Sequence, residues 1–452
     1  MLWHSTGIAA VTALLAVCAP SGGYAQFPQT TVLFQNVRVF DGRNGTLSAP
    51  TNVLIRGNKI ERITSADIPT DRSAATTIIN GGGRTLMPGL SDMHWHAMLV
   101  RPTPAEVLGS DIGYTNLLAG AEATATLMRG FTTIRDLGGP SFGLKRAIDD
   151  GVVPGPRIYP SGAVITITSG HGDFRQLSDL PRTIGGLRSR IEQIGGSMIA
   201  DSPDEVRLRV REQLMQGASQ IKLTAGGGVA SPFSPLDVST FTEAELGAAV
   251  EAATNWGTYV STHAYTPASI QRSIAAGVKV IEHGHLMDDA TARLMAGKSI
   301  WLSTQPFLDM SGAAALGPQE QAKMQQVVSG TDSVYALAKK YRIKTAFGTD
   351  ILFSAALAAR QTAMLTSLTR WFTPAEVLIM ATSTNAELLA LSGLRNPYPG
   401  KLGVVEEGAL ADLLMADGDP IANLGIIEDP ARNFLVIMKD GKIYKNTLVQ
   451  SQ

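Results

Sequence analysis

Short apolar runs alternate with helical segments through the middle of the chain, from Met87 to about Leu391. This alternation is typical of repeated βα units, which assemble into a parallel sheet. Eight such runs occur, and eight is the number of strands that a closed barrel needs. They end near His96, Asp136, Ser161, Leu223, His263, His283, Thr304 and Asp350. We therefore predict an α/β fold built on a (β/α)8 TIM-like barrel.

The two ends of the chain have a different pattern, in which short β-like runs are joined by tight turns. The runs cover residues 31–34, 37–40, 53–55 and 78–79 at one end and 413–415, 434–438 and 443–444 at the other. Strands on both sides of a long alternating middle predict a small β-sandwich domain formed from both chain ends. The expected domain boundaries are 26–86 for the N-terminal segment of the sandwich, 87–395 for the barrel and 396–452 for the C-terminal segment of the sandwich.

Two segments within the barrel are longer than ordinary βα loops. They cover residues 173–213 and 306–334. Long connections at the mouth of a barrel often cover the site, so both are predicted to form lids.

The N-terminus reads as a secretory signal peptide over residues 1–25. Its apolar stretch, 7–19, is too short to span a bilayer, and the small residues before Gln26 suit cleavage near Ala25. No Lys or Arg precedes Arg38, and Cys18 offers the alternative of a lipid anchor, although Val17 fits that signal poorly. We expect an exported protein, periplasmic or secreted. Its mature form would have no cysteine, which excludes disulfides and a cysteine nucleophile.

Length and charge narrow the class of partner. The 452 residues exceed a single core, which favours a large catalytic domain with a smaller companion. Lys plus Arg (38) nearly balance Asp plus Glu (39), so nothing indicates bulk attraction to nucleic acid or to a membrane. We expect a small-molecule substrate, no nucleic acid and no stable membrane span.

Polar side chains that can bind metal stand at the ends of the predicted strands. They are His94, His96, Lys222, His263, His283 and Asp350. Histidine nitrogens and a carboxylate suit zinc and its neighbours, and catalytic groups of such barrels gather at the carboxyl ends of the strands. The pattern predicts a hydrolase with two divalent metal ions, zinc first among the candidates.

Each residue also has a plainer interpretation. His94 and His96 are two apart on one strand and project to the same side, so they can share one ion. His263 and His283 end adjacent strands and form a natural second site, although a lone strand histidine is more often a core residue. Asp350 can serve as ligand and proton shuttle, or simply as a helix cap.

Lys222 lies within the apolar run 220–223, where a buried ammonium would cost several kcal/mol without a partner. A desolvated lysine loses its proton readily and can add carbon dioxide, and the resulting carbamate presents two oxygens that can bridge two cations. The alternative is a lysine that points outward between helices.

The motifs around these residues resemble the amidohydrolase superfamily, binuclear type with a carboxylated lysine. Residues 88–96 resemble its first-strand motif and 347–350 its last. The resemblance implies that His94, His96 and Asp350 hold the buried metal and that Lys222, as N6-carboxylysine, bridges. His263 and His283 would hold the exposed metal. Members often assemble, which implies a homo-oligomer.

Segments 221–228, 263–265 and 282–285 resemble a narrower branch, which includes Xaa-Pro dipeptidase-like and imidazolonepropionase-like enzymes and hydrolases of ochratoxin. In that branch a histidine after the third strand polarises the scissile carbonyl, which implies this role for His171. Groups past the fifth strand grip the carboxylate of the substrate, which implies Tyr265 and Arg272 as substrate-binding residues. Glu282 and His285 are candidates to orient His283 or to meet a lid.

The predicted reaction is cleavage of an amide in a carboxylate-bearing substrate by metal-activated water, with Asp350 and His171 as catalytic residues. Candidate substrates are dipeptides and N-acyl amino acids, including ochratoxin A, which would release phenylalanine. Two alternatives stay open: a mononuclear deaminase or cyclic-amide (imidazolone-type) hydrolase on the same scaffold, and a non-catalytic barrel scaffold.

Overall fold

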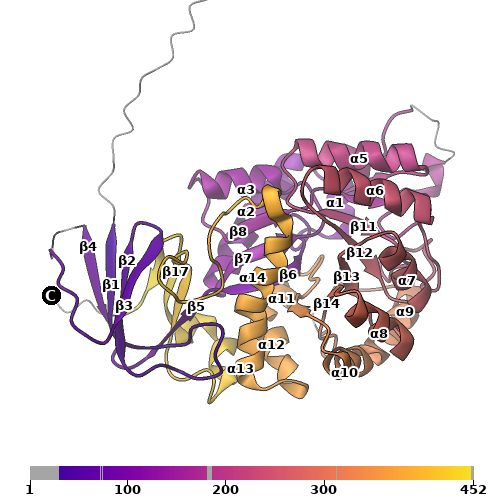
Figure 1. The fold of residues 1–452 in the computed structure, drawn as a ribbon. Helices are drawn as coiled ribbons and strands as arrows, with labels where there is room; N and C mark the ends of the chain where they lie inside the picture. The colour runs from indigo at the N-terminus through magenta and orange to yellow at the C-terminus, as the bar shows by residue number, and fades with distance from the viewer. Residues whose placement is uncertain (1–29, 72, 74, 181–185, 312, 449–452) are drawn as a thin grey trace, which may run out of the picture.

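A computed structural model describes residues 30–71, 73, 75–180, 186–311 and 313–448. The signal peptide expected over residues 1–25, with Cys18 and the cleavage position Ala25, lies outside these ranges. Figure 1 shows a β-rich region made from both ends of the chain beside a larger region in which helices surround strands.

Both chain ends contribute strands to one sheet, in the order β18-β17-β16-β5-β1-β2-β3, with β4 paired to β1. The strands are β1 (Thr31–Val39), β2 (Thr51–Arg56), β3 (Lys59–Thr64), β4 (Thr76–Asn80), β5 (Thr85–Pro88), β16 (Leu413–Ala416), β17 (Phe434–Lys439) and β18 (Lys442–Asn446). The runs 31–34 and 37–40 belong to one strand, β1. Asn36 lies between them with a φ of 52° at a register shift, and the pairing with β2 resumes at Val37. The sequence pattern does not predict β3 and β5.

Among the described residues the larger region holds ten strands, all paired in parallel. They are β6 (Leu90–Trp95), β7 (Phe131–Asp136), β8 (Arg157–Pro160), β9 (Val164–Thr166), β10 (Ser197–Ile199), β11 (Ile221–Thr224), β12 (Val260–Ala264), β13 (Val280–His283), β14 (Trp301–Thr304) and β15 (Thr345–Phe347). The pairing gives a sheet β6-β7-β8 and a sheet β10-β9-β11-β12-β13-β14-β15.

The three-stranded sheet meets the longer sheet at both of its own edges, β6 and β8. The amide of Asp350, just past β15, donates to the carbonyl of His94 at 2.8 Å, and the amide of Ser219 donates to the carbonyl of Pro160 at 2.8 Å. The third predicted strand, which ends near Ser161, corresponds to β8, and a break at Gly162, with a φ of 74°, separates it from β9, which the sequence pattern does not predict. A Cβ at that glycine would lie 2.3 Å from the side chain of Gln213, so the break needs glycine. The eight predicted strand ends therefore share one face of a TIM-barrel type arrangement.

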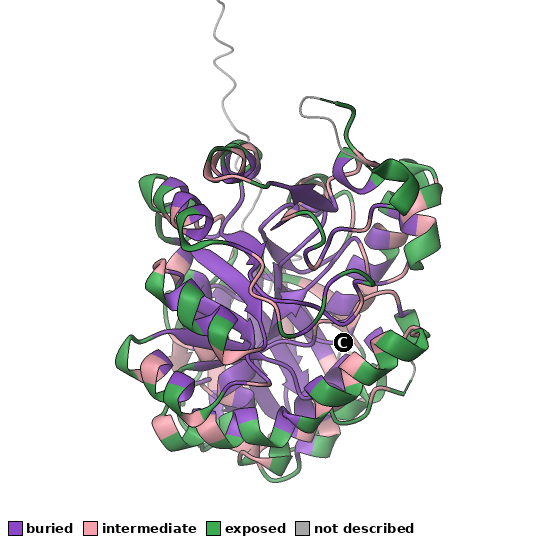
Figure 2. Ribbon diagram, turned by 90° about the vertical axis from the view of Figure 1, so that its right-hand side faces the viewer, coloured by how far each residue is buried: buried purple, intermediate pink, exposed green. Residues whose placement is uncertain are grey.

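Helices follow most of these strands and turn their exposed faces outward, while the strands inside are buried (Figure 2). They are α1 (Pro104–Gly109), α2 (Ile112–Met128), α3 (Phe142–Asp149), α4 (Arg190–Gln193), α5 (Pro203–Met215), α6 (Glu243–Asn255), α7 (Pro267–Ala275), α8 (Asp289–Gly297), α9 (Pro318–Ser329), α10 (Thr331–Tyr341), α11 (Ala355–Ala358), α12 (Gln361–Thr366), α13 (Pro374–Ile379), α14 (Asn385–Leu389) and α15 (Pro430–Asn433). Shorter turns are η1 (Leu177–Asp179), η2 (Ser367–Arg370), η3 (Met380–Thr384), η4 (Ala390–Arg395) and η5 (Leu424–Glu428).

The first predicted lid is not a loop throughout. Segment 173–213 contains β10, which pairs with β9, and most of α5, which packs against α6, so its second half belongs to the scaffold. Its period-2 run 197–199 is too short to stand out in the sequence. The second segment, 306–334, leads into α9 and contributes Leu316 and Glu320 to the cavity described below.

One stretch, Pro374–Arg395, is long and apolar enough to cross a bilayer by length and composition, with a mean hydropathy of 1.4. Half of its most apolar window is buried in the fold. Within it, Asn385 donates its side-chain amide to the carbonyls of Ser91 at 2.9 Å and Phe347 at 3.2 Å. These contacts pack the helix against β6 and β15. The expected lack of a stable membrane span stays a prediction.

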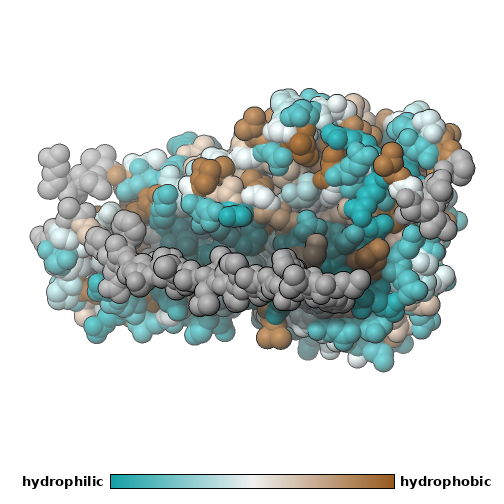
Figure 3. Space-filling model, turned by 90° about the horizontal axis from the view of Figure 1, so that it is seen from above, coloured by the Kyte–Doolittle hydropathy of each residue, from teal (hydrophilic) through white to brown (hydrophobic). Residues whose placement is uncertain are grey.

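The face seen from above carries mostly hydrophilic side chains, with hydrophobic ones scattered between them (Figure 3). Single exposed apolar residues of this kind are ordinary on a protein surface.

Candidate metal centre

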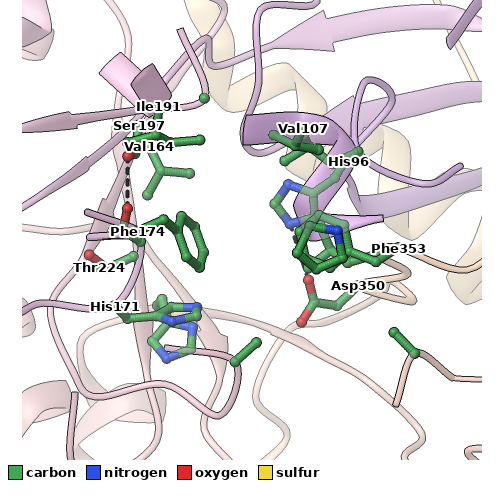
Figure 4. A pocket seen from close by; sticks show the side chains of 18 of the residues that line it. His96, Val107, Val164, His171, Phe174, Ile191, Ser197, Thr224, Asp350 and Phe353 are labelled. Carbon is green, nitrogen blue, oxygen red and sulfur yellow. Dashed lines mark hydrogen bonds and ion pairs between the residues drawn. The ribbon is translucent and has the colours of Figure 1, made fainter. Parts of the chain in front are cut away.

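Three of the predicted ligands converge at the carboxyl ends of β6 and β15. The ligand atoms of His94, His96 and Asp350 all lie within 4.8 Å of one another. Oδ1 of Asp350 is 3.2 Å from Nε2 of His94 and 3.1 Å from Nε2 of His96. Nζ of Lys222, from β11, lies 3.4 Å from the same nitrogen of His94. Figure 4 shows His96 and Asp350 on one side of the pocket, facing His171 across it.

The other two predicted ligands complete the cluster. The ring of His283 lies 4.9 Å from that of His94 and 4.4 Å from that of His263, measured between centroids. All six residues that the sequence singled out for metal binding therefore lie at one end of the barrel, and all but Asp350 are buried.

Hydrogen bonds to the outer nitrogens decide which ring nitrogen of each histidine is free. Nδ1 of His96 faces the carbonyl oxygen of Gly138 at 3.2 Å, and Nε2 of His263 faces that of Gly227 at 2.8 Å. A carbonyl can only accept, so these nitrogens carry the proton. Nε2 of His96 and Nδ1 of His263 are left without one and can bind a cation.

The other two histidines share a neighbour, Gln305. Nδ1 of His283 lies 2.7 Å from Oε1 of Gln305, which can only accept, so this nitrogen carries the proton and Nε2 of His283 is free. Nδ1 of His94 lies 3.1 Å from the carboxylate of Glu282 and 3.2 Å from the side-chain nitrogen of Gln305. Gln305 was not singled out from the sequence, since an uncharged residue just past β14 has no signature of its own.

Glu282 has a different neighbour from the one that we expected. It orients His94 rather than His283, and its other oxygen accepts from Arg135 at 2.6 Å and from Ser261. Both members of the Arg135–Glu282 pair are fully buried. The pKa of Glu282 is lowered because the charge of Arg135 and the contact with His94 outweigh its burial.

Burial lowers the pKa of the histidines around the centre. It lowers that of His96, takes that of His171 to about 4, and holds those of His263 and His283 well below their usual range. Burial also lowers the pKa of Lys222 to about 8. Neutral imidazoles are the form that binds metal, and a neutral amine is the form that can add carbon dioxide.

The carboxylate of Asp350 stays ionised. Burial acts to raise its pKa, but the neighbouring His94 and His96 hold the pKa well below its usual range. An ionised oxygen thus lies close to a ring nitrogen of each histidine, at 3.2 and 3.1 Å. Two imidazoles and a carboxylate that converge in this way are a donor set that fits a divalent ion.

Two of the predicted ligands lie on strained backbone. His283 has a φ of 76° and Asp350 a φ of 55°, values that side chains other than glycine seldom adopt. Backbone hydrogen bonds hold both residues in place. The amide of Asp350 donates to the carbonyl of His94, and the amide of Gly284, which follows His283, donates to the carbonyl of Ala264. Strain that the surroundings impose at such positions is common at functional sites.

A cavity of about 290 Å³ opens in front of the cluster. Besides the centre itself, its wall is largely apolar. The apolar side chains are Leu99, Pro104, Val107, Leu108, Val164, Phe174, Ile191, Ala230, Pro232, Ala314, Ala315, Leu316, Leu352 and Phe353. Among the described residues of the wall, Lys222 is the one lysine or arginine, and Glu320 is the one acidic side chain apart from Asp350.

The three residues expected to bind substrate have different positions. His171 lines the cavity, with its ring 4.3 Å from that of His263. Tyr265 is buried behind the ligands, with its ring 4.7 Å from that of His263 and 4.9 Å from that of His283. Arg272 lies on the exposed side of α7 and donates to the carbonyl of Phe241 at 3.0 Å.

The arrangement therefore does not support Arg272 as a grip for the substrate. Arg272 does not belong to the described wall of the cavity. His285 meets the second lid segment as expected, since it stacks on Phe307 with the ring centroids 5.0 Å apart.

Comparison with known proteins gives a consistent result. The model of the amidohydrolase family matches residues 85–445. Ochratoxinase from Aspergillus niger is 30% identical over 383 residues, which is 80% of this chain and 75% of that protein.

Solved structures agree. The crystal structure of an amidohydrolase has a TM-score of 0.85 at 35% identity and covers 93% of this chain and all of that one. That of a prolidase complexed with N-methylphosphonate-L-proline has a TM-score of 0.84 at 31% identity, covering 92% and 100%. That of A. niger ochratoxinase has a TM-score of 0.79 at 27% identity, covering 93% and 96%.

Proposed function

Since the chain belongs to the amidohydrolase family, we propose that it cleaves the amide bond of a dipeptide or an N-acyl amino acid and releases the terminal amino acid. The chain is a hydrolase that acts on C–N bonds, as its relatives indicate. The observation that carries the proposal is the convergence of Asp350 with ring nitrogens of His94 and His96.

His94, His96 and Asp350 would hold one divalent ion, His263 and His283 the other, and Lys222 would bridge them as a carbamate. When bound, such ions lower the pKa of a water molecule and polarise a carbonyl. The low pKa of the amine supports the carbamate, because at neutral pH a lysine with a pKa of about 8 is neutral far more often than an exposed lysine. The position of Lys222 beside His94 favours this arrangement over a mononuclear deaminase or imidazolone hydrolase.

Asp350 is placed to move the proton. The side chain of Asp350 is 17% exposed, more than that of His94 or His96, so one oxygen can face the cavity. We propose that it takes the proton of the attacking water and delivers it to the leaving nitrogen. His171, on the opposite wall, donates a hydrogen bond to the carbonyl oxygen as negative charge develops there.

The apolar wall of the cavity favours a substrate that carries bulky apolar groups on both sides of its amide bond. No arginine among the described wall residues offers a clamp for the carboxylate of the substrate, so the positive charge of the centre itself would attract it. This fits N-acyl derivatives of apolar amino acids better than charged dipeptides. Ochratoxin A, the compound that gives the A. niger relative its name, is one candidate, with phenylalanine as the released amino acid.

Three further proposals extend the description. The terminal sheet forms a small β-sandwich, because Phe34, Val53, Met415 and Val436 from both chain ends share a separate buried core. The domains follow the boundaries 26–86, 87–395 and 396–452. The chain is exported with removal of residues 1–25, and it forms a homo-oligomer.

The test is release of free amino acid from N-acetyl-phenylalanine, N-benzoyl-phenylalanine, leucyl-proline, phenylalanyl-proline and ochratoxin A. Parallel samples are treated with a chelator and then given zinc. We expect release from at least one apolar substrate, loss of release with chelator and recovery with zinc. No release from any of them would refute the proposed substrate class, and release that resists complete metal removal would refute the mechanism.

A further inference from the structure

One short loop contacts two of the histidines at the site. Residues 226–231, which follow β11 and which we call the glycine loop, place the carbonyl of Gly227 2.8 Å from Nε2 of His263. The hydroxyl of Ser231 lies 2.8 Å from Nδ1 of His171. The loop therefore touches the outer nitrogen of a predicted ligand and that of the residue expected to meet the carbonyl.

The loop lies against the ring of His171 with no room for a side chain between them. A Cβ at Gly228 would lie 2.0 Å from Nδ1 of His171 and 2.2 Å from its Cγ. Glycine at this position lets the backbone support the face of the ring. The ring is thus held from the side by Gly228 and at its outer nitrogen by Ser231.

The partners of Ser231 decide which nitrogen of His171 carries the proton. Its oxygen already accepts the amide hydrogen of Gly172 at 3.0 Å. The hydroxyl has one hydrogen to donate, and among the described residues Nδ1 of His171 is the acceptor within reach of it, at 2.8 Å. A neutral imidazole that accepts at Nδ1 carries its hydrogen at Nε2, so Nε2–H is the donor left for a ligand in the cavity.

We propose that Ser231 is a positioning residue, which fixes the ring and the tautomer of His171 so that its Nε2–H donates to the oxyanion of the reacting amide. The inference rests on the proposed function for the reaction itself. The contact of Ser231 with His171 does not depend on the identity of the substrate.

Lys323 on α9 holds the glycine loop in place. Its ammonium donates to the carbonyls of Gly228, Ser231 and Ser234 at 3.3, 2.9 and 2.8 Å. Three carbonyls in and just after the loop around a single ammonium fix that loop to the second lid segment. Glu320, one helical turn earlier on α9, lines the cavity. The lid and the position of His171 are therefore connected through one side chain.

The kinetic test compares Ser231→Ala with Ser234→Ala. Ser234 is a matched control, because it is buried in the same region and its hydroxyl has no hydrogen-bond partner among the described residues. Loss of an orienting hydrogen bond of this kind typically lowers activity about 10- to 100-fold. We expect Ser231→Ala to lower kcat by that factor with KM changed less than about threefold, and Ser234→Ala to leave both unchanged. An unchanged kcat in Ser231→Ala would overturn the proposal.

A double variant separates positioning from general loss of structure. If Ser231 acts through His171, then His171→Ala combined with Ser231→Ala has the kcat of His171→Ala alone. A further drop of about 10-fold or more in the double variant would overturn the proposal. Crystal structures of the wild type and Ser231→Ala test it without any substrate. We expect a rotated or disordered His171 ring in the variant, and an unmoved ring would contradict the inference.

These outcomes remain distinct from failure of the proposed function. A wild type that hydrolyses none of the test substrates refutes the function, whereas the ring position in the two crystal structures still decides the role of Ser231.

Discussion

Oδ1 of Asp350 lies 3.1 Å from Nε2 of His96, and burial favours the neutral form of this imidazole by lowering its pKa. The outer nitrogen of His96 lies 3.2 Å from the carbonyl oxygen of Gly138 and can donate to it, which leaves Nε2 unprotonated in the neutral ring. An unprotonated nitrogen and an ionised carboxylate are stable at this separation when a cation joins them. The positions of these side chains therefore fit a candidate metal site.

Asp350→Asn tests the proton-transfer role. The amide keeps one oxygen for a metal but cannot take a proton from water, so we expect kcat to fall at least about 100-fold. Asp332→Asn, an exposed aspartate paired with Arg370 on the surface, is the control and should keep full activity. Turnover is measured with the best substrate from the test set. A variant with more than half the wild-type kcat would exclude Asp350 as the proton carrier.

Assembly of the centre should depend on pH through Lys222. Its pKa is lowered from 10.5 to about 8, so the neutral amine grows from about one-tenth of the population at pH 7 to about nine-tenths at pH 9. Carbamate formation requires the neutral amine. We expect the rate at which chelated enzyme regains activity with zinc and bicarbonate to rise about tenfold over this range.

The free energy of unfolding of the metal-free protein should also depend on the protonation of Lys222. The folded chain binds this proton less tightly than the unfolded chain, so stability increases as the pH rises from about 8 to 10.5.

A reactivation rate that is flat between pH 7 and 9 in saturating bicarbonate would show that the lysine amine is not the titrating group.

Glu282→Gln removes the charge that balances Arg135 inside the barrel. Both side chains are fully buried, and leaving one buried charge unpaired typically costs about 3–5 kcal/mol. We expect the free energy of unfolding in urea to fall by that amount and His94 to bind metal more weakly. The surface variant Asp332→Asn should unfold like the wild type. Equal stability of Glu282→Gln and the wild type would mean that the pair does not hold the barrel interior.

Phe174→Ala tests the apolar wall. Phe174 lines the cavity and is shown there in Figure 4, so its loss should raise KM for N-benzoyl-phenylalanine about 10-fold and affect N-acetyl-alanine little. Phe233→Ala is the matched control, since Phe233 is 44% exposed and outside the described wall. A larger loss with the small substrate than with the aromatic one would contradict an apolar binding wall.

The strand ends could be predicted from the sequence because the rule that places them is local. Each apolar run ends where the next polar residue begins, and parallel strands bring those ends together, which placed His263 and His283 side by side. Gln305, which orients His283, and Ser231, which orients His171, have no local pattern and depend on contacts far apart in the chain.

Other features depended on geometry that no sequence pattern fixes. Arg272 lies on the exposed side of α7 and outside the described cavity wall, because the rotation of α7 about its own axis decides which side faces the mouth. That rotation is set by packing against α6 and α8. The break between β8 and β9 at Gly162 and the pairing of β10 with β9 also arise from tertiary contacts. The placement of the predicted metal ligands was unaffected because they lie at the ends of buried strands.

The most direct test of a bridged two-metal centre is the zinc content of purified Lys222→Ala, measured by mass spectrometry beside the wild type and Lys298→Ala, an exposed lysine at the end of α8. We expect about two ions per chain in the wild type and the control, and fewer than one in Lys222→Ala together with loss of hydrolysis. Two ions and full turnover in Lys222→Ala would contradict a bridging role for this lysine.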